Sequence, residues 1–463
     1  MPSATFKQYW LPEKKGFDCL TLRDVPKEQP KFGQILVRVK AVSLNWRDGI
    51  LAIGTYPFPG PDAVVPGSDG AGIVEEVGEG VTGWKVGDRV LANFTQDHIA
   101  GRLTHAVPAF DLILNFLPMA MESPALAEAL MAYASGHLSS IDPSYTAVSL
   151  AARSNALGAL SKTICPPNQE TACSDTTLSA CLILLTSEVC LGSHTSWYSH
   201  LVGAKHLITS AQSQPGQTSG PTIHGPEALK LTSEGRWVLR NFAFHDIIGS
   251  VTLGVKPLLN PDYLRDIVDE FDTYLGVAAG LLISISEITC LDAPTDTDTG
   301  CIPFRAYLDI EQELNSWQCP NDTPPAIEAV AYAYRGAALI HLYRKMRRQL
   351  QALHAASVLS TPLDRMSLET LEGKIQTQVS NTINIISDIP EDHVSESSLL
   401  FPLFIVGGET KVDSQMYTIR SRLQSSYHKR RFGNISRALE VLEDLWARRK
   451  TQKLMCGTLD WRK

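Results

Sequence analysis

The sequence predicts a two-part fold, with an all-β module in about the first hundred residues and a large all-α region after it. Glycine is concentrated at the start, where residues 1–100 hold 12 of the 32 glycines. Apolar residues alternate with a period of two in this part, and beyond Pro108 they recur at steps of three and four. A chain of 463 residues is also too long for one ordinary domain.

Composition excludes several classes of protein. The chain is 44% hydrophobic with a net charge of −8, which favours a globular protein and argues against one that coats nucleic acid by bulk electrostatics. No apolar signal segment opens the sequence, and its longest apolar runs are far shorter than the roughly 18 residues of a membrane span. The nine cysteines form no C-x-x-C pair, so we expect reduced thiols.

The β-module begins with clear alternation. Gln34–Leu44 places Ile35, Val37 and Val39 on one face of a strand, and Leu36, Arg38 and Lys40 on the other. Shorter strands are expected at 71–78 and 88–94, bounded by glycine, proline and aspartate.

Gly78, Gly80 and Gly83 form a literal G-x-G-x-x-G between these two shorter strands. A dinucleotide site needs a helix to begin within the glycines, because the pyrophosphate rests on the amides of its N-terminus. Here another strand follows, so we interpret the glycines as a turn and expect no Rossmann domain.

Helical periodicity begins at Ser123, which is a good N-cap followed by Pro124 at the first helical position. In the last helix Asn434 is the expected cap, and Ile435, Leu442 and Trp446 belong to the buried stripe. Further helices are predicted at 262–282, 326–353 and 434–449.

Residues 1–104, through "GQILVRVKAVSLNWRDGILAIGTYP" and "VPGSDGAGIVEEVGEGVTGWKVGDRVLANF", resemble the GroES-like N-terminal domain of zinc-free medium-chain dehydrogenases and reductases. The resemblance implies a β-barrel module beside a substrate cleft. Zinc-dependent members carry a cysteine at the position of Asn45, and histidine and glutamate at Ser68 and Asp69, so no catalytic zinc is expected. The nucleotide-binding domain of that family is missing from the sequence, and we therefore expect neither a bound cofactor nor catalytic residues.

Asn45 and Asp48 match a cleft-lining motif of the zinc-free relatives and are candidate remnants of a substrate cleft. The alternative is that both side chains satisfy hydrogen bonds of turns and strand ends.

Residues 107–463 resemble the fungal-specific transcription-factor domain, the helical regulatory region of zinc-cluster activators. "LPMAMESPALAEALMAYASGHL", "FAFHDIIGSVTLG", "LFPLFIVGGE" and "HKRRFGNISRALEVLEDLWARR" carry this resemblance. It implies a nuclear regulator, often of metabolic gene clusters. The family's six-cysteine DNA reader is missing, so direct DNA binding is not expected.

Two polar features in this region have competing interpretations. Residues 417–463 hold 12 Lys or Arg and 4 Asp or Glu, which fits weak phosphate binding or, more simply, a solvated helical face. His245 and Asp246 are adjacent on a helix and point to different sides, so we interpret them as structural.

The leading hypothesis is a transcription co-regulator in the nucleus, which binds a protein partner such as a transcription factor, or a small effector. The alternative is a cytoplasmic, NADPH-dependent, truncated oxidoreductase-like protein. A third possibility is that two neighbouring genes are joined near His98–Phe110.

Overall fold

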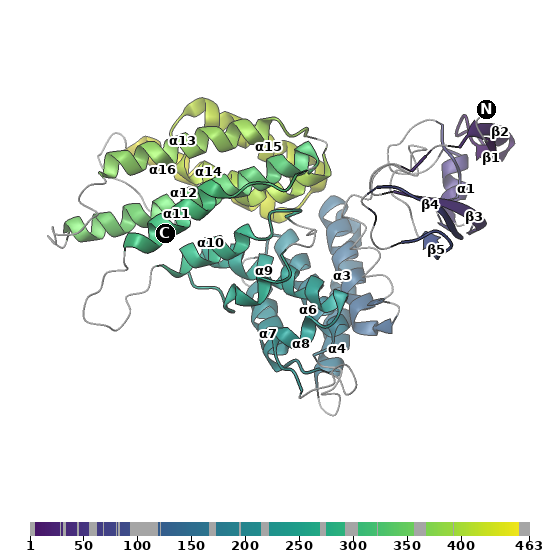
Figure 1. The fold of residues 1–463 in the computed structure, drawn as a ribbon, viewed down its shortest axis with the longest axis horizontal. Coiled ribbons are helices and arrows are strands. Elements are labelled where there is room, and N and C mark those ends of the chain that lie inside the picture. The colour runs from purple at the N-terminus through teal and green to yellow at the C-terminus, as the bar shows by residue number, and fades with distance from the viewer. Residues whose placement is uncertain are drawn as a thin grey trace. The chain divides into compact units, whose positions relative to one another are not determined.

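The computed structural model describes most of the chain, and every structural statement below concerns these residues: 5–27, 29–30, 34–43, 46–54, 63–67, 69–79, 81, 84–92, 119–120, 122–165, 173–193, 196–213, 222–268, 275–291, 304–321, 323–355, 367–391 and 393–452. The chain divides into two compact units, Met1–Phe110 and Asp111–Lys463, which we call the strand unit and the helical unit. Their contents confirm the predicted fold class (Figure 1).

The strand unit contains two small sheets in its described part. One pairs β1 (Thr5–Trp10) with β2 (Thr21–Pro26), and the other has the order β3-β4-β5. Every described strand pair is antiparallel. The remaining elements are β3 (Ile35–Ser43), α1 (Trp46–Ala52), β4 (Asp69–Val77) and β5 (Arg89–Ala92).

The glycine-rich segment therefore connects two antiparallel neighbours, β4 and β5, as the interpretation of a turn required. Gly78 donates its amide hydrogen to the Gln34 carbonyl oxygen at 2.8 Å, next to the first pair of the β3–β4 ladder. Gly80 and Gly83 lie outside the described residues.

The alternation predicted along β3 is only partly reproduced. Its pairing with β4 shifts register between Leu36 and Val37 and again between Val39 and Ala41. Each such irregularity changes which face the following side chains occupy. Val39, predicted on the same face as Ile35 and Val37, is 58% exposed.

The helical unit consists of helices joined by turns, gathered in two groups in Figure 1: α3 to α10, and α11 to α16. The first group comprises α3 (Pro124–Ile141), α4 (Thr146–Ile164), α6 (Asp175–Cys190), α7 (Ser196–Ser210), α8 (Pro226–Leu229), α9 (Ser233–Leu253) and α10 (Leu281–Cys290). The second comprises α11 (Phe304–Ser316), α12 (Pro325–Ala355), α13 (Leu368–Ser387), α14 (Leu400–Glu409), α15 (Asp413–Arg430) and α16 (Gly433–Gln452).

Local signals place most helix ends. The Ser123 hydroxyl accepts the Leu126 amide hydrogen at 3.3 Å with Pro124 in the first turn, which confirms the predicted cap of α3. The cap predicted at Asn434 is wrong, because α16 already begins at Gly433 and Asn434 lies inside its first turn. The Oδ1 atom of Asn434 is buried and has no hydrogen-bond partner among the described residues.

The continuous helix predicted over 262–282 is also wrong. A short 3-10 helix covers Pro261–Leu264, and α10 begins only at Leu281. Gly276 between them has φ +59°, a left-handed conformation that a right-handed helix cannot accommodate.

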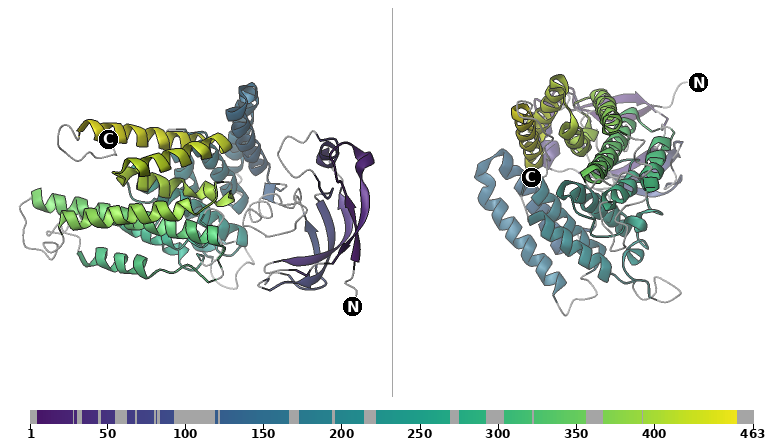
Figure 2. Two further views of the ribbon diagram at one scale, coloured as in Figure 1. Left: turned by 90° about the horizontal axis from the view of Figure 1, so that it is seen from above. Right: turned by 90° about the vertical axis from the view of Figure 1, so that its left-hand side faces the viewer.

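The core of the helical unit is organised around α12, which packs against α10, α11, α13 and α14. Tyr334, Leu339 and Met346 of this helix are at most 1% exposed. At the other side of the unit, α3 and α4 lie against each other as a helical hairpin (Figure 2). Among the described helices, none combines the length and apolar character needed to cross a membrane.

Candidate functional site

In the strand unit, Asp48 lies in the first turn of α1 and is only 7% exposed. Its carboxylate accepts the Gly67 amide hydrogen at 3.0 Å. Gly67 has φ +90°, and a side chain there would approach the Val42 methyl group to 2.7 Å. Asp48 thus fixes a turn that tolerates little but glycine. Asn45 and Ser68 lie outside the described residues, so the cleft formed by Asn45 and Asp48 stays a prediction.

In the helical unit, His245 and Asp246 of α9 diverge as their adjacent positions predict. His245 contacts the Thr186 hydroxyl through Nε2 at 3.2 Å, and burial lowers the pKa of its imidazole to about 4. Asp246 accepts the amide hydrogens of Leu258 and Leu259 at 2.8 and 3.1 Å, and burial raises the pKa of its carboxyl to about 6. Through these hydrogen bonds, His245 connects α9 to α6, and Asp246 connects it to the segment that follows α9.

The described thiols and acidic side chains are not arranged as a metal centre. In the described part of the chain, no three or more His, Cys, Asp or Glu side chains are grouped to hold a metal ion. Cys181 is buried and donates its thiol hydrogen to the His200 carbonyl oxygen at 3.3 Å, as a core cysteine would. Burial raises the pKa of this thiol to about 12, which keeps it protonated and unreactive.

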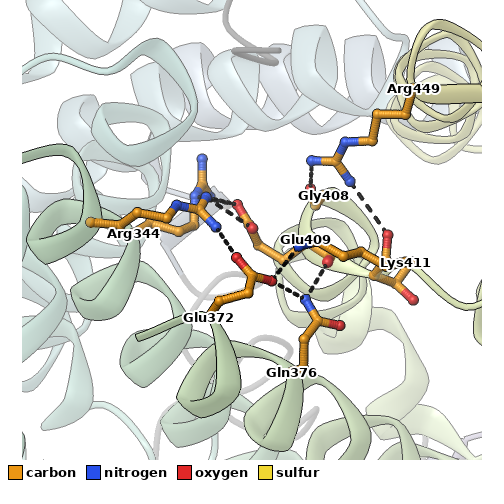
Figure 3. A network of polar contacts seen from close by, with 9 residues as sticks. Arg344, Glu372, Gln376, Gly408, Glu409, Lys411 and Arg449 are labelled. Atoms are coloured by element: carbon orange, nitrogen blue, oxygen red, sulfur yellow. Dashed lines mark hydrogen bonds and ion pairs between the residues drawn. The ribbon is translucent and has the colours of Figure 1, made fainter. Parts of the chain in front are cut away.

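A buried ionic cluster joins the C-terminal end of α14 to α12 (Figure 3). Glu409, which is 1% exposed, forms an ion pair with Arg344, whose Nε lies 3.0 Å from one carboxylate oxygen, and accepts hydrogen bonds from Arg347 Nη2 at 3.0 Å to each carboxylate oxygen. Arg347 also donates to Glu372 of α13 at 3.0 Å. We call these four residues the Glu409 cluster. Removing Glu409 would take from Arg344 and Arg347 the buried carboxylate that they share.

Residues around the cluster complete the junction of four helices. Lys411 pairs with Glu372 at 2.6 Å, and Arg449 of α16 donates to the Gly408 carbonyl oxygen at 2.6 Å. Burial opposes ionisation of Glu372, but hydrogen bonds from Lys411 and Gln376 outweigh it and lower the pKa of the carboxyl. Each carboxylate is satisfied by cations, so the cluster holds helices together and offers no nucleophile or base.

A second polar feature opens to solvent between α12 and α13. Six residues line most of a groove of about 340 Å³: Tyr332, Arg335, Gly336, Gln378, Asn381 and Thr382. We call it the α12–α13 groove. Gly336 and Thr382 touch closely, since a side chain at Gly336 would lie 2.1 Å from Thr382 Oγ1. The glycine thus lets the two helices approach at this point.

The polar groups of the groove are incompletely satisfied. Thr382 is 0% exposed, and its hydroxyl oxygen has no hydrogen-bond partner among the described residues. Arg335 donates to the Trp317 carbonyl oxygen at 3.2 Å, and its guanidinium carbon lies 5.0 Å from the centre of the Tyr332 ring. None of the lining residues is acidic. The groove is thus a positively charged recess with unused hydrogen-bonding groups.

The basic C-terminal stretch is largely paired within the described residues. Arg422 and Arg430 both contact Glu396, at 3.1 and 2.8 Å, and Arg420 contacts Glu443 at 3.0 Å. Lys429, Arg437 and Arg448 have their own carboxylate partners. This pairing reduces the positive charge that is available to bind the phosphates of a nucleic acid.

The surface of α4 carries a regular row of apolar side chains. Leu150, Leu157 and Ile164 follow each other at intervals of seven residues and are 61%, 40% and 37% exposed. A spacing of seven places side chains on one side of a helix, as in helices that pack against another helix.

Neither the Glu409 cluster nor the groove is predicted by the sequence. One signal for the groove was present, because Gly336 interrupts an otherwise strong helical sequence and such a glycine often marks close packing. The cluster has no such signal, since its members come from three helices separated along the chain.

Comparisons with known proteins separate the two units in the same way. Residues 109–463 match the family described as the fungal specific transcription factor domain. Residues 31–110 match the alcohol dehydrogenase GroES-like domain.

Several similar proteins match about a fifth of the chain. A zinc-type alcohol dehydrogenase-like protein of Schizosaccharomyces pombe is 48% identical over 93 residues, which are 20% of this chain and 27% of the relative. An alcohol dehydrogenase of Geobacillus stearothermophilus is 38% identical over 90 residues, 19% of this chain and 25% of the relative. A quinone oxidoreductase of Pseudomonas aeruginosa is 44% identical over 104 residues, 21% of this chain and 32% of the relative. The chain therefore spans only a quarter to a third of the length of these relatives.

Proposed function

Because the chain belongs to the fungal-specific transcription factor domain family, we propose that it is a nuclear co-regulator of transcription that acts by binding a protein partner or a small effector. The observation that carries this proposal is the extent of the family match, which covers residues 109–463 and so the whole helical unit. Regulation of metabolic genes is the role that the family resemblance favours.

Two features of the surface support action through a partner in place of direct DNA binding. The basic side chains of α15 and α16 are largely paired with carboxylates, which weakens their attraction for phosphate. The heptad-spaced row of Leu150, Leu157 and Ile164 leaves apolar surface exposed on α4, where a helix of another protein could pack.

Complementation of a strain that lacks the gene tests this function. The strain receives the wild-type chain, the variant Leu157→Glu or the control Asn155→Glu, which places the same charge at another exposed position of α4. We expect the wild-type chain and the control to restore the transcript profile and Leu157→Glu to fail. An unchanged transcript profile in the deletion strain would contradict a regulatory role.

The strand unit supports a second candidate function, because the relatives that it matches include a quinone oxidoreductase and alcohol dehydrogenases. We propose that residual NADPH-linked activity is the alternative. Titration of the purified chain with NADPH, followed by nicotinamide fluorescence, distinguishes the candidates. Saturable binding at micromolar concentrations would favour the oxidoreductase.

A separate observation tests whether both units are made as one chain. Recovery from cells of peptides that span residues 98–110 would show that they are.

A further inference from the structure

We propose that the α12–α13 groove binds a small aromatic monocarboxylate. This inference deepens the proposed function, on which it rests for its biological role, by giving the effector a site and a chemical class. Its starting point is the volume of about 340 Å³, near the lower end of the range for small-molecule pockets.

The positive charge of Arg335 indicates that the ligand carries a carboxylate. Arg335 is positioned by its hydrogen bond to the Trp317 carbonyl oxygen, yet no described carboxylate forms an ion pair with it. A guanidinium presents several N–H donors in one plane, a geometry that matches a carboxylate. One positive charge without a neighbouring acid balances a monoanion better than a phosphate, which carries nearly two negative charges at neutral pH.

Hydrogen-bonding groups beside Arg335 can complete the recognition. The carboxamides of Gln378 and Asn381 line the same groove from successive turns of α13, and each offers two N–H donors. Thr382 is 0% exposed and its hydroxyl lies against Gly336, so this residue shapes the contact between the two helices and leaves recognition of the ligand to Arg335, Gln378 and Asn381.

Apolar side chains that line the groove indicate that the rest of the ligand is an aromatic ring. The Tyr332 ring forms one wall, held edge-on to the Trp317 ring at a centroid distance of 5.7 Å. Ile385 lines the groove from α13. A flat aromatic body between these side chains leaves its carboxylate within reach of Arg335, because Arg335 already lies over the Tyr332 ring.

Isothermal titration of the full chain with benzoate tests the inference. Benzamide serves as the uncharged probe of the same shape, and inorganic phosphate as the competing anion. We expect saturable binding of benzoate, at least tenfold tighter than that of benzamide or phosphate. No saturable benzoate binding up to about 10 mM, or equal binding of either comparison probe, would overturn the proposal.

Variants locate the binding in this groove. Arg335→Gln should weaken benzoate binding at least tenfold, and Asn381→Ala, which removes a carboxamide that lines the groove, should weaken it several-fold. Arg305→Gln removes an 88% exposed arginine side chain on α11 and should change the affinity less than twofold. Circular dichroism confirms that each variant is folded, and an unchanged affinity in folded Arg335→Gln would place the binding elsewhere and refute the inference.

The two proposals fail in distinguishable ways. Benzoate binding is measured on purified protein and needs no transcription. If benzoate binds as expected but the deletion strain shows a normal transcript profile, the ligand site stands and the regulatory function falls. If transcripts change but benzoate does not bind, the regulatory function stands and the ligand inference is wrong.

Discussion

The strand unit and the helical unit differ in how they use apolar side chains. In the described part of the strand unit, the buried apolar residues are Leu11, Leu51, Ala52, Val64 and Val74. Several apolar side chains are exposed there, including Phe6, Tyr9, Phe17, Leu22, Val39 and Val86. The helical unit instead has one continuous core that runs from α3 to α16.

This difference explains why charged side chains are buried in the helical unit. The helical unit surrounds Glu409 and Arg344 with helices on several sides, so a buried ion pair there is held in fixed geometry. In the strand unit, an ion pair such as Lys7 with Asp24 is exposed and contributes little. We therefore expect that removal of a single buried charged group lowers the free energy of unfolding of the helical unit strongly. Removal of an exposed charged group of the strand unit should lower it little.

The largest effect is expected from Glu409→Gln, which keeps the size of the side chain but leaves Arg344 and Arg347 without their buried counter-charge. We expect the free energy of unfolding of the helical unit to fall by about 3–5 kcal/mol in urea titrations. The control Glu440→Gln removes an exposed partner of Arg437 and should cost less than about 1 kcal/mol. Equal losses in both variants would show that burial does not set the strength of the cluster.

A pair of leucine truncations compares the two units directly. Leu339→Ala, at a 0% exposed position of α12, should lower the free energy of unfolding by about 2–5 kcal/mol. Leu22→Ala, at a 55% exposed position of β2, should change stability by less than about 0.5 kcal/mol. Thermal unfolding of the full chain measures both, and a large loss from Leu22→Ala would mean that this face of β2 is covered in solution.

Acidification tests the two neighbouring buried groups of α9. The lowered pKa of His245 gives stability that is present above its unfolded pKa of 6.5 and is lost as pH falls through about 4. The raised pKa of Asp246 has the opposite effect, giving stability that is present below 3.8 and lost as pH rises through about 6. The two contributions oppose each other between pH 7 and pH 4.5.

His245→Gln removes one of these opposing contributions. Relative to the wild-type chain, this variant should gain about 2–3 kcal/mol when the pH is lowered from 7 to 4.5, as measured by urea unfolding at both values. His428→Gln, at an exposed position of α15, is the matched control and should follow the wild-type profile. A His245→Gln profile identical to that of the wild type would show that the imidazole is protonated freely in the folded state.

The smallest effect is expected at the end of α15. Arg431 has φ 54°, a left-handed conformation that glycine adopts without strain. Arg431→Gly should therefore raise the free energy of unfolding by up to about 1 kcal/mol, unless its contact with the Tyr427 ring contributes more. Comparison with Arg431→Ala in the same unfolding assay separates the backbone effect from loss of the side chain.

Local signals in the sequence were sufficient for much of the fold. The Ser123–Pro124 pair marked the start of α3, and the apolar stripe through Ile435, Leu442 and Trp446 identified α16, because caps and helical periodicity depend on nearby residues. Periodicity failed at 262–282, where Gly276 breaks the backbone within an apolar pattern that resembles a helix. The two register shifts of β3 also could not be predicted from alternation, because they depend on the partner strand.

The sequence by itself determined the two structural classes, their order along the chain and the family of the helical part. Those properties depend on period, glycine usage and motifs that persist over long stretches. Only the tertiary structure decided that Glu409 meets Arg344 and Arg347, and that Gly336 lies against Thr382 in a polar groove. These contacts join helices distant in the chain, and their geometry follows from how α12, α13 and α14 pack, which no local pattern encodes.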